Sequence, residues 1–169
     1  MRSGRSEKQS KGTMKKVFHF GSPQEWYQAD AAIVWCFDSR FELAFRKFLK
    51  RHGIVNFDAI RVGGGAKSIA SPDQESDREF VLGEIRKSIQ LHATTRLILV
   101  SHSDCGAYGR LHGGFGGDPD AEAKHHEQEL RKAATVIAER LPGITVQSYF
   151  VDFEGIWEVD SEAAQNAGS

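Results

Sequence analysis

Hydrophobic residues recur along the middle of the chain in a pattern that alternates between strand and helix. Four short apolar runs predict strands at residues 31–37 (AAIVWCF), 57–62 (FDAIRV), 96–102 (RLILVSH) and 144–153 (ITVQSYFVDF). The first run fits a buried strand that ends at Cys36, and the third is the strongest strand signal and ends at His102.

Helical spacing separates these strands. An aromatic stripe at helical spacing follows the first strand, and Gly53 is a stop signal for that helix; the stripe is Phe41, Phe45, Phe48 and Leu49. It indicates core or a dimer contact rather than a substrate pocket. The sequence Ser71-Pro72-Asp73-Gln74 has the form of a capping box for a helix that runs to about Leu91. Asp118-Pro119 starts a long helix to about Leu141.

Strands that alternate with helices predict parallel pairing through right-handed crossovers. We therefore expect an α/β fold with three layers, α/β/α, around a four-stranded, mostly parallel sheet. Ligands of such sheets bind beyond the carboxyl ends of the strands. Cys36 and His102 stand at two of those ends, and Cys105 follows one turn later, so three potential metal ligands should meet at one edge.

Composition narrows the class of protein. The chain has 169 residues, of which 40% are hydrophobic and 27% are charged, and this composition indicates one ordinary globular domain. We expect the domain at residues 14–160, between a disordered basic tail (1–13) and a flexible tail (161–169). The net charge of −1 argues against nucleic acid as a partner. No apolar run reaches 18 residues, and the basic N-terminus lacks the apolar stretch of a signal peptide, so we expect a cytoplasmic protein that does not bind membranes.

The candidate chemistry lies around the two cysteines. Zinc prefers thiolate and imidazole ligands, and catalytic sites leave a fourth position open, so Cys36, His102 and Cys105 could hold one Zn²⁺ per chain. By spacing alone this signal is weak, because free cysteines are often buried as small hydrophobic residues. Asp38 and Arg40 stand beside Cys36, and a paired arginine would keep the carboxylate ionised and oriented. The alternative makes Asp38 a helix N-cap and leaves Arg40 solvated.

Two sequence motifs together are a more specific signal than the spacing of the three ligands alone. Cys36-Phe37-Asp38-Ser39-Arg40, followed about 65 residues later by His102-Ser103-Asp104-Cys105-Gly106, resembles the β-class carbonic anhydrases. The resemblance implies that Cys36, His102 and Cys105 are zinc ligands and that Asp38 and Arg40 are the catalytic dyad. It also implies that Gly106 shapes the surroundings of the metal through its small size and its backbone N–H. The implied reaction is reversible hydration of carbon dioxide to bicarbonate by a zinc-bound hydroxide that Asp38 orients, in a homodimer or higher homo-oligomer.

Some positions depart from that family. Its usual R-N-A-G-N stretch is replaced by Arg61-Val62-Gly63-Gly64-Gly65, so Gly64 is the candidate pocket residue, although a plain tight turn would also explain the glycines. The family's arm brings a glutamine to the pocket, for which Gln24 and Gln28 are candidates. The loop Gly113–Asp120 is either a lid or an ordinary surface loop. Candidates for a proton shuttle, by residue type only, are His52, Tyr108, His112, His125 and His126.

Other functions stay open from the sequence. A relative on this scaffold could hydrolyse carbonyl sulfide or carbon disulfide, and a zinc module without catalysis could bind a partner. A second metal at Glu122/His126 or His125/Glu129 is imaginable at i, i+4 spacing, where a solvated helix face is the ordinary interpretation. A thiol redox protein with a Cys36–Cys105 disulfide is disfavoured, because it leaves His102 without a role and the chain has no C-x-x-C pair.

Overall fold

The computed structural model describes residues 10–109 and 115–160. Its main sheet has five strands in the order β4-β3-β5-β6-β7, and the first four of these run parallel. The strands are β3 (Ala31–Trp35), β4 (Phe57–Arg61), β5 (Arg96–His102), β6 (Thr145–Val151) and β7 (Ile156–Val159). The helices are η1 (Ser39–Phe41), α1 (Glu42–Arg51), α2 (Lys67–Ala70), α3 (Glu75–His92), α4 (Gly106–Gly109) and α5 (Pro119–Arg140).

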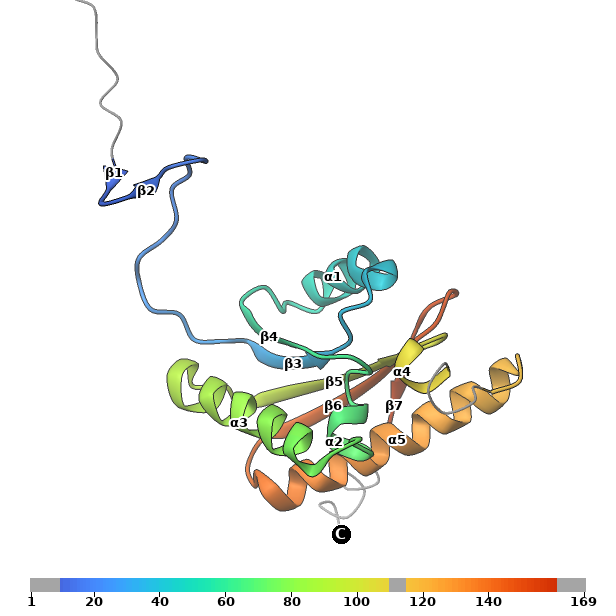
Figure 1. The fold of residues 1–169 in the computed structure, drawn as a ribbon. Coiled ribbons are helices and arrows are strands. Elements are labelled where there is room, and N and C mark those ends of the chain that lie inside the picture. Colours follow the sequence, from blue (N-terminus) through green and yellow to red (C-terminus); the bar gives the residue numbers. More distant parts are fainter. Residues whose placement is uncertain (1–9, 110–114, 161–169) are drawn as a thin grey trace, which may run out of the picture.

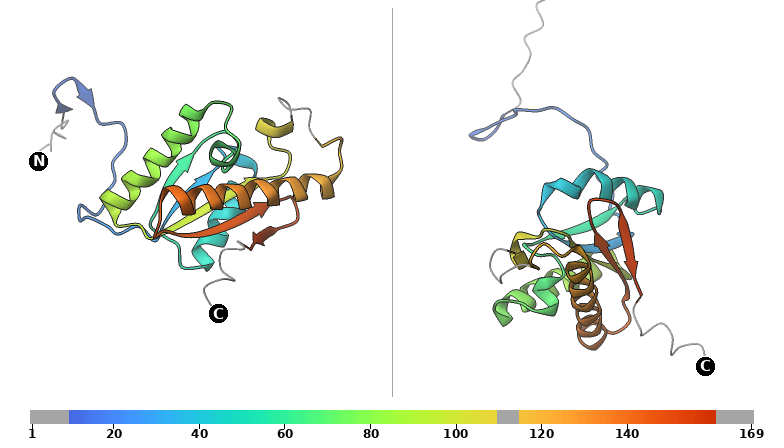
Figure 2. Two further views of the ribbon diagram at one scale, coloured as in Figure 1. Left: turned by 90° about the horizontal axis from the view of Figure 1, so that it is seen from below. Right: turned by 90° about the vertical axis from the view of Figure 1, so that its right-hand side faces the viewer.

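The helices form two layers, as expected from the sequence. Helix α1 covers one face of the sheet, and α2, α3 and α5 cover the other (Figures 1 and 2). The strand order explains this division. The chain steps from β3 to β4 in one direction but from β4 to β5 and from β5 to β6 in the opposite direction. Because crossovers between parallel strands are right-handed, a change of direction changes the face on which the helix lies. The three-layer α/β/α prediction is confirmed.

Both faces of the central strands are buried, which explains their unbroken apolar runs. On β3, Ala32 and Val34 pack with the core under α2, α3 and α5, while Ala31, Ile33 and Trp35 pack with the core under α1. The aromatic stripe of α1 belongs to this second core, where Phe41 and Phe45 are buried and Phe48 packs against them. Its interpretation as core is therefore confirmed.

The predicted number of strands was wrong. A fifth strand, β7, pairs antiparallel with β6 at the edge of the sheet. The connecting turn is closed by Asp152, whose Oδ1 accepts hydrogen bonds from the backbone N–H groups of Glu154 and Gly155. The last predicted strand, 144–153, ends at Val151 for this reason. Strand β7 gives little periodicity in the sequence, because its four residues are only partly buried or exposed.

The start of α3 also differs from the prediction. The helix begins at Glu75, and its capping box is formed by Gln74 and Asp77 rather than by Ser71 and Gln74. Tertiary partners occupy the earlier side chains: Ser71 donates a hydrogen bond to Glu129 of α5, and Asp73 pairs with Lys67 of α2 at 2.7 Å. These contacts, which link residues on different elements, displaced the local capping pattern.

The N-terminal segment is extended up to β3. Ser10–Lys11 (β1) and Met14–Lys15 (β2) form a small antiparallel pair, and the chain then stands away from the body before it reaches the sheet (Figures 1 and 2). This arm carries exposed hydrophobic side chains, among them Val17, Phe18 and Phe20, which are 72–88% exposed. At its root, Trp26 Nε1 donates to the carbonyl of Leu91 at 2.7 Å. The domain bounds 14–160 stay a prediction, and residues 1–9 and 161–169 of the two predicted tails lie outside the described residues.

Asp30, just before β3, is expected to stabilise the fold. Its Oδ2 accepts hydrogen bonds from the backbone N–H groups of Val55 and Asn56 at 2.9 and 2.8 Å, and these bonds lower its pKa. Asp30→Ala should reduce the free energy of unfolding by about 1–3 kcal/mol, because two N–H groups lose a charged acceptor. A group with a lowered folded pKa stabilises above its unfolded pKa, so the difference from wild type should shrink as pH falls below about 4.

Urea unfolding of wild type, Asp30→Ala and Asp30→Asn between pH 3 and 7 measures this effect. The asparagine keeps one acceptor oxygen and removes the titration. It should therefore lose less stability than the alanine variant and show no pH-dependent part. Equal stability of all three proteins at pH 7 would contradict the assignment.

Candidate metal centre

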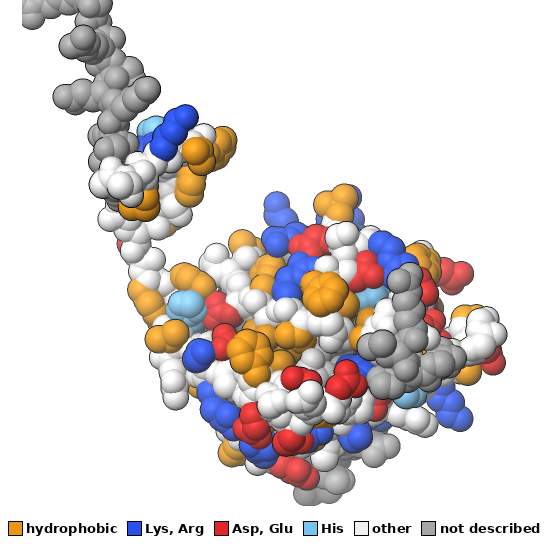
Figure 3. Space-filling view, viewed as in Figure 1, with side chains coloured by type: hydrophobic (Ala, Val, Ile, Leu, Met, Phe, Trp, Pro, Cys, Tyr) orange, Lys and Arg blue, Asp and Glu red, His pale blue; other side chains and the backbone are white. Residues whose placement is uncertain are grey.

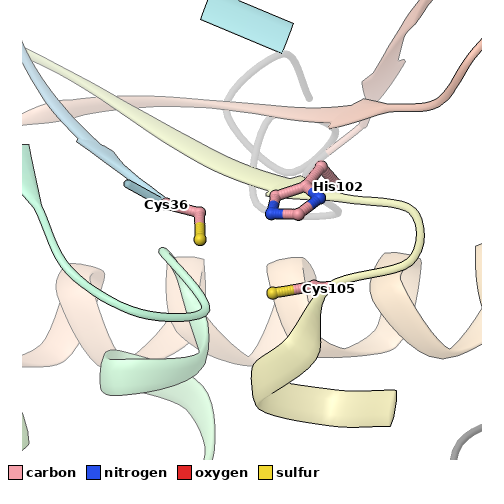
Figure 4. A group of neighbouring side chains, drawn as sticks. All are labelled: Cys36, His102 and Cys105. Atoms are coloured by element: carbon pink, nitrogen blue, oxygen red, sulfur yellow. The ribbon is translucent and has the colours of Figure 1, made fainter. Parts of the chain in front are cut away.

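Cys36, His102 and Cys105 converge at the carboxyl edge of the sheet (Figure 4). Cys36 follows the last residue of β3, His102 ends β5, and Cys105 lies just before α4. Strands β3 and β5 are direct neighbours and share the register Val34↔Leu99. They flank the point at which the strand order reverses direction, where α/β sheets bind their ligands. The sequence therefore located this edge correctly.

The three side chains fit a metal ion. All three residues are buried, with exposed fractions of 6% or less, and their ligand atoms lie within 4.8 Å of one another. A zinc–sulfur bond of about 2.3 Å gives a tetrahedral edge of about 3.8 Å, so small movements would close the set around one ion. In the part of the chain that the structure describes, no other group of three His, Cys, Asp or Glu residues meets this criterion.

The ring of His102 is oriented for such a role. Its Nδ1 lies 2.8 Å from the carbonyl oxygen of Ser103, so Nδ1 carries the proton and donates it to that oxygen. Its buried Nε2 has no hydrogen-bond partner among the residues described. A buried imidazole nitrogen without a partner is costly, and a metal ion would satisfy it.

The two cysteine side chains shift each other's pKa. The hydrogen bond with Cys105 lowers the pKa of Cys36 from 9.0 to about 4, although burial opposes this shift. The same bond raises the pKa of Cys105 far above its ordinary value. Backbone N–H groups of Asp38 and Gly64 further favour the Cys36 thiolate. One thiolate therefore forms readily, and a bound divalent ion would displace the second proton.

Asp38 and Arg40 form the pair that the sequence suggested. Arg40 Nε lies 3.1 and 3.0 Å from the two carboxylate oxygens of Asp38, and Nη2 lies 2.7 Å from Oδ2. These hydrogen bonds lower the pKa of Asp38 from 3.8 to about 2, so the carboxylate stays ionised near neutral pH. Asp38 also accepts the backbone N–H of Arg40 as the N-cap of η1. Asp38 is therefore both the N-cap of η1 and the partner of Arg40, and its catalytic role stays a prediction.

The glycine run has a steric cause that its sequence alone did not reveal. Gly65 has φ +57°, and a Cβ there would lie 2.3 Å from the carbonyl oxygen of Val100 and 3.1 Å from the backbone nitrogen of Cys36. Gly64 has φ +79°, and a Cβ would meet Lys67 Cβ at 2.9 Å and Ala107 Cβ at 3.1 Å. Both glycines thus let this turn lie directly against the elements that carry the two cysteines.

Gly65→Ala should be among the most destabilising single substitutions in the chain. Positive φ and overlap with two backbone atoms should together lower the free energy of unfolding by about 2–4 kcal/mol. The matched control is Gly83→Ala in the middle of α3, where a Cβ meets no atom within 4 Å and should stabilise the helix by about 0.5–1 kcal/mol. Thermal and urea unfolding of both variants measure the contrast. A harmless Gly65→Ala would contradict the close packing.

The role that the resemblance implies for Gly106 stays a prediction. A Cβ at this position meets no atom within 4 Å. The backbone N–H groups that favour the Cys105 thiolate belong to Ala107 and Tyr108.

Arg61 braces the centre from the neighbouring strand, a role that the sequence did not indicate. It ends β4, and its Nη2 donates to the carbonyl of Cys36 at 3.1 Å. Its guanidinium also pairs with Glu42 and lies 4.7 Å from the ring centroid of Trp35. Two signals in the sequence pointed to this position: Arg61 lies at the end of a predicted strand, and it matches the arginine of the R-N-A-G-N stretch.

A cleft of about 1270 Å³ opens at this edge. Its wall includes the two cysteines, the Asp38–Arg40 pair and the glycine turn, together with apolar side chains such as Phe37, Val62 and Phe80. Figure 3 shows hydrophobic side chains in the middle of this face, bordered by charged ones. Of the predicted lid, Phe115–Pro119 line the cleft; residues 113 and 114 lie outside the described residues.

The remaining candidates fall into different places. His126 is fully buried, and burial lowers its pKa to about 3, so it does not take up a proton near neutral pH. Tyr108 is buried and donates to Glu129, while His52 is exposed and packs on Phe48. His112 lies outside the described residues. His126 Nε2 is 4.0 Å from Glu122, which alone does not make a second metal site.

Within one chain, Gln24 and Gln28 do not lie at the metal cluster. Gln28 Nε2 donates to the carbonyl of Ala93 at 3.4 Å, beside the start of β5, and Gln24 is exposed. This is the amino end of β5, whereas the metal cluster lies at the carboxyl ends of the parallel strands. A contribution of either residue to a partner's pocket stays a prediction.

Fold and site together define an α/β protein with a Cys-His-Cys cluster, able to hold a metal ion, at the switch point of a parallel sheet. Residues 27–161 match the family model described as "Putative carbonic anhydrase". The chain belongs to this family and is a β-carbonic anhydrase-like protein.

Two rickettsial proteins are similar in sequence. Proteins of Rickettsia bellii and Rickettsia conorii, both named as uncharacterized, are 23% and 24% identical over 133 residues. The matched region is 78% of this chain and 81% and 72% of theirs. These names therefore give no information on the activity of this chain.

Solved structures share the fold. They include the β-carbonic anhydrase TvaCA1 of Trichomonas vaginalis (TM-score 0.55, 13% identity, 85% of this chain and 88% of that chain). A tetrameric β-carbonic anhydrase of Sordaria macrospora has a TM-score of 0.54 at 17% identity, over 79% and 81% of the two chains. The carbonic anhydrase of Glaciozyma antarctica has a TM-score of 0.52 at 17% identity, over 80% and 84%. No described helix is long and apolar enough to cross a membrane.

Proposed function

We propose that this protein is a zinc enzyme that converts carbon dioxide and water reversibly to bicarbonate and a proton. One observation carries the proposal: a buried Cys-His-Cys cluster stands beside an ionised Asp38 that Arg40 holds in place, at the wall of an open cleft. A purely structural metal needs neither the carboxylate nor its arginine. The family and the fold suggest an enzyme of this kind.

Cys36, His102 and Cys105 would hold the zinc. When bound there, zinc would supply the Lewis acidity that makes hydroxide available near neutral pH. Because two thiolates cancel the formal charge of the ion, orientation of the attacking oxygen by the protein matters more than in a site of three histidines.

Asp38 is proposed to provide that orientation. Its lowered pKa keeps it a pure hydrogen-bond acceptor, so it can accept a hydrogen bond from the O–H of the nucleophile and direct a lone pair at the carbon of carbon dioxide. Arg40 keeps the carboxylate ionised and fixes its direction. Apolar groups of the cleft, among them Val62 and Phe37, suit an uncharged substrate without hydrogen-bond donors. The proton shuttle is not assigned.

A stopped-flow hydration assay on the zinc-loaded protein tests the proposal. We expect kcat/KM above about 10⁴ M⁻¹s⁻¹, within the ordinary range for enzymes. Sulfide release from carbonyl sulfide and from carbon disulfide is measured beside it. Faster sulfide release than hydration would favour the hydrolase alternative, and zinc binding without any turnover would favour a module that binds a partner.

We also propose a homodimer or higher homo-oligomer. The exposed apolar arm, with Val17, Phe18 and Phe20, supports this, because such side chains are usually covered. Sedimentation of the full chain should give at least twice the mass of one chain, 18.8 kDa, and Phe18→Asp/Phe20→Asp should shift it toward the monomer. A monomeric wild type would contradict this. The proposed location is the cytoplasm, without nucleic acid or membrane as a partner.

A further inference from the structure

The guanidinium of Arg40 is shared between two carboxylates. Beside its bonds to Asp38, Arg40 Nη1 donates to Asp104 Oδ2 at 2.6 Å, and Nη2 donates to the backbone carbonyl of Asp104 at 2.9 Å. Asp104 lies between the two predicted ligands His102 and Cys105. The position of this short loop therefore decides where Arg40 sits, and Arg40 decides whether Asp38 is held or free.

The loop itself is clamped by α5. Glu122 Oε1 accepts the backbone N–H of Asp104 at 2.7 Å, and its Oε2 accepts the hydroxyl of Ser103 at 3.1 Å. The Glu122 side chain is only 15% exposed. On the other side, Ser103 N–H donates to the carbonyl of Val151 at 2.9 Å.

Asp104 needs this support. Its φ is +53°, in the left-handed region, which costs a residue other than glycine about 1–2 kcal/mol. Since its side chain is 73% exposed, local packing does not hold it in place. Besides Arg40, which donates to the Asp104 carbonyl, the hydrogen bonds that hold Ser103 and Asp104 from outside the loop, among the residues described, are the two accepted by Glu122 and the one from Ser103 N–H to the Val151 carbonyl.

We propose that Glu122 is a positioning residue that, through Asp104, keeps Arg40 on Asp38 and so keeps Asp38 from entering the open position of the metal. This inference rests on the proposed function. A released carboxylate two residues from Cys36 would be a ready zinc ligand, because carboxylate oxygen is one of the ligand types that zinc accepts. Loss of Glu122 should thus close the site from within and leave the three protein ligands in place.

Azide titration of the cobalt-substituted protein, followed by visible absorption, tests this directly. Wild type should bind cobalt and then azide at the open position. Glu122→Ala should bind cobalt but take up azide at least about 10-fold more weakly, since Asp38 competes. The double variant Glu122→Ala/Asp38→Ala should regain azide binding, which a damaged fold would not do. Glu122→Gln, which keeps one acceptor oxygen, should lie between wild type and Glu122→Ala.

The matched control is Asp120→Ala. It removes a carboxylate from the same first turn of α5, where Asp120 is exposed and does not touch the loop, and it should bind azide as wild type does. Asp104→Asn gives a second measurement if Glu122→Ala does not fold: it removes the charge that pairs with Arg40 and should also weaken azide binding.

The two possible failures are distinguishable. Wild-type azide affinity in both Glu122→Ala and Asp104→Asn overturns the positioning role, and so does a double variant that fails to regain azide. A wild-type protein that takes up no cobalt at Cys36, His102 and Cys105 overturns the proposed function itself.

Discussion

Cys36→Ser should lose stoichiometric zinc and, with it, carbon dioxide hydration. Cys36 contributes the thiolate that forms most readily, and its carbonyl and sulfur are held by Arg61 and by the N–H groups of Asp38 and Gly64. Removal of a residue that merely orients a metal ligand already costs 10–100-fold in affinity. Loss of a ligand from a set of three should cost at least about 100-fold, enough to leave the protein without metal after dialysis.

Metal analysis of the dialysed protein by mass spectrometry, with circular dichroism as a check on folding, measures this. Phe37→Ser is the matched control, because it alters the next residue, whose side chain is exposed, and should keep about one zinc per chain. An unchanged zinc content in Cys36→Ser would falsify the site assignment.

Asp38→Asn should separate metal binding from catalysis. The amide has nearly the same size but no charge, so it pairs poorly with Arg40 and orients the nucleophile badly. We expect kcat/KM to fall by about 100- to 10,000-fold with unchanged zinc content. Since the pKa of Asp38 is about 2, its carboxylate should stay ionised throughout the assay range. The stabilising pair with Arg40 is present above the unfolded pKa near 4 and is lost only as pH falls through about 2.

Stopped-flow assays between pH 6 and 9 with parallel metal analysis measure these effects. The control is Asp77→Asn, an aspartate on the wall of the same cleft that should leave kcat/KM within a factor of about two. If Asp38→Asn hydrates carbon dioxide as fast as wild type, then Asp38 has no catalytic role and the proposed orientation of the nucleophile by its carboxylate is contradicted.

Most of the sheet could be predicted because its strands carry their own signal. Strands β3 and β5 are buried on both faces, so their apolar runs are unbroken and their ends are clear. Strand β7 lacked that signal, since Trp157 and Glu158 are exposed and its pairing depends on the turn at Asp152. The start of α3 was misplaced because Ser71 has a partner on α5, which local spacing does not encode.

The candidate ligands could be predicted for a related reason. Cysteine and histidine are residue types that bind zinc, and their place at the end of a buried strand predicts at which edge of the sheet they lie. What surrounds the ligands could not be predicted. Glu122 lies 18 residues beyond Asp104 in a helix whose sequence predicts only a solvated face on that side. Gly65 gave no sign of the Val100 carbonyl against which it packs.

By itself, the sequence determined the residue types of the candidate site, their places after strands and the α/β class, because these depend on neighbours within a few positions. The tertiary structure decided that β3 and β5 lie side by side, that Arg40 bridges Asp38 and Asp104, and that α5 clamps the loop between His102 and Cys105. Those contacts join residues up to 65 positions apart, and only the crossing of the chain over the sheet brings such residues within hydrogen-bond distance.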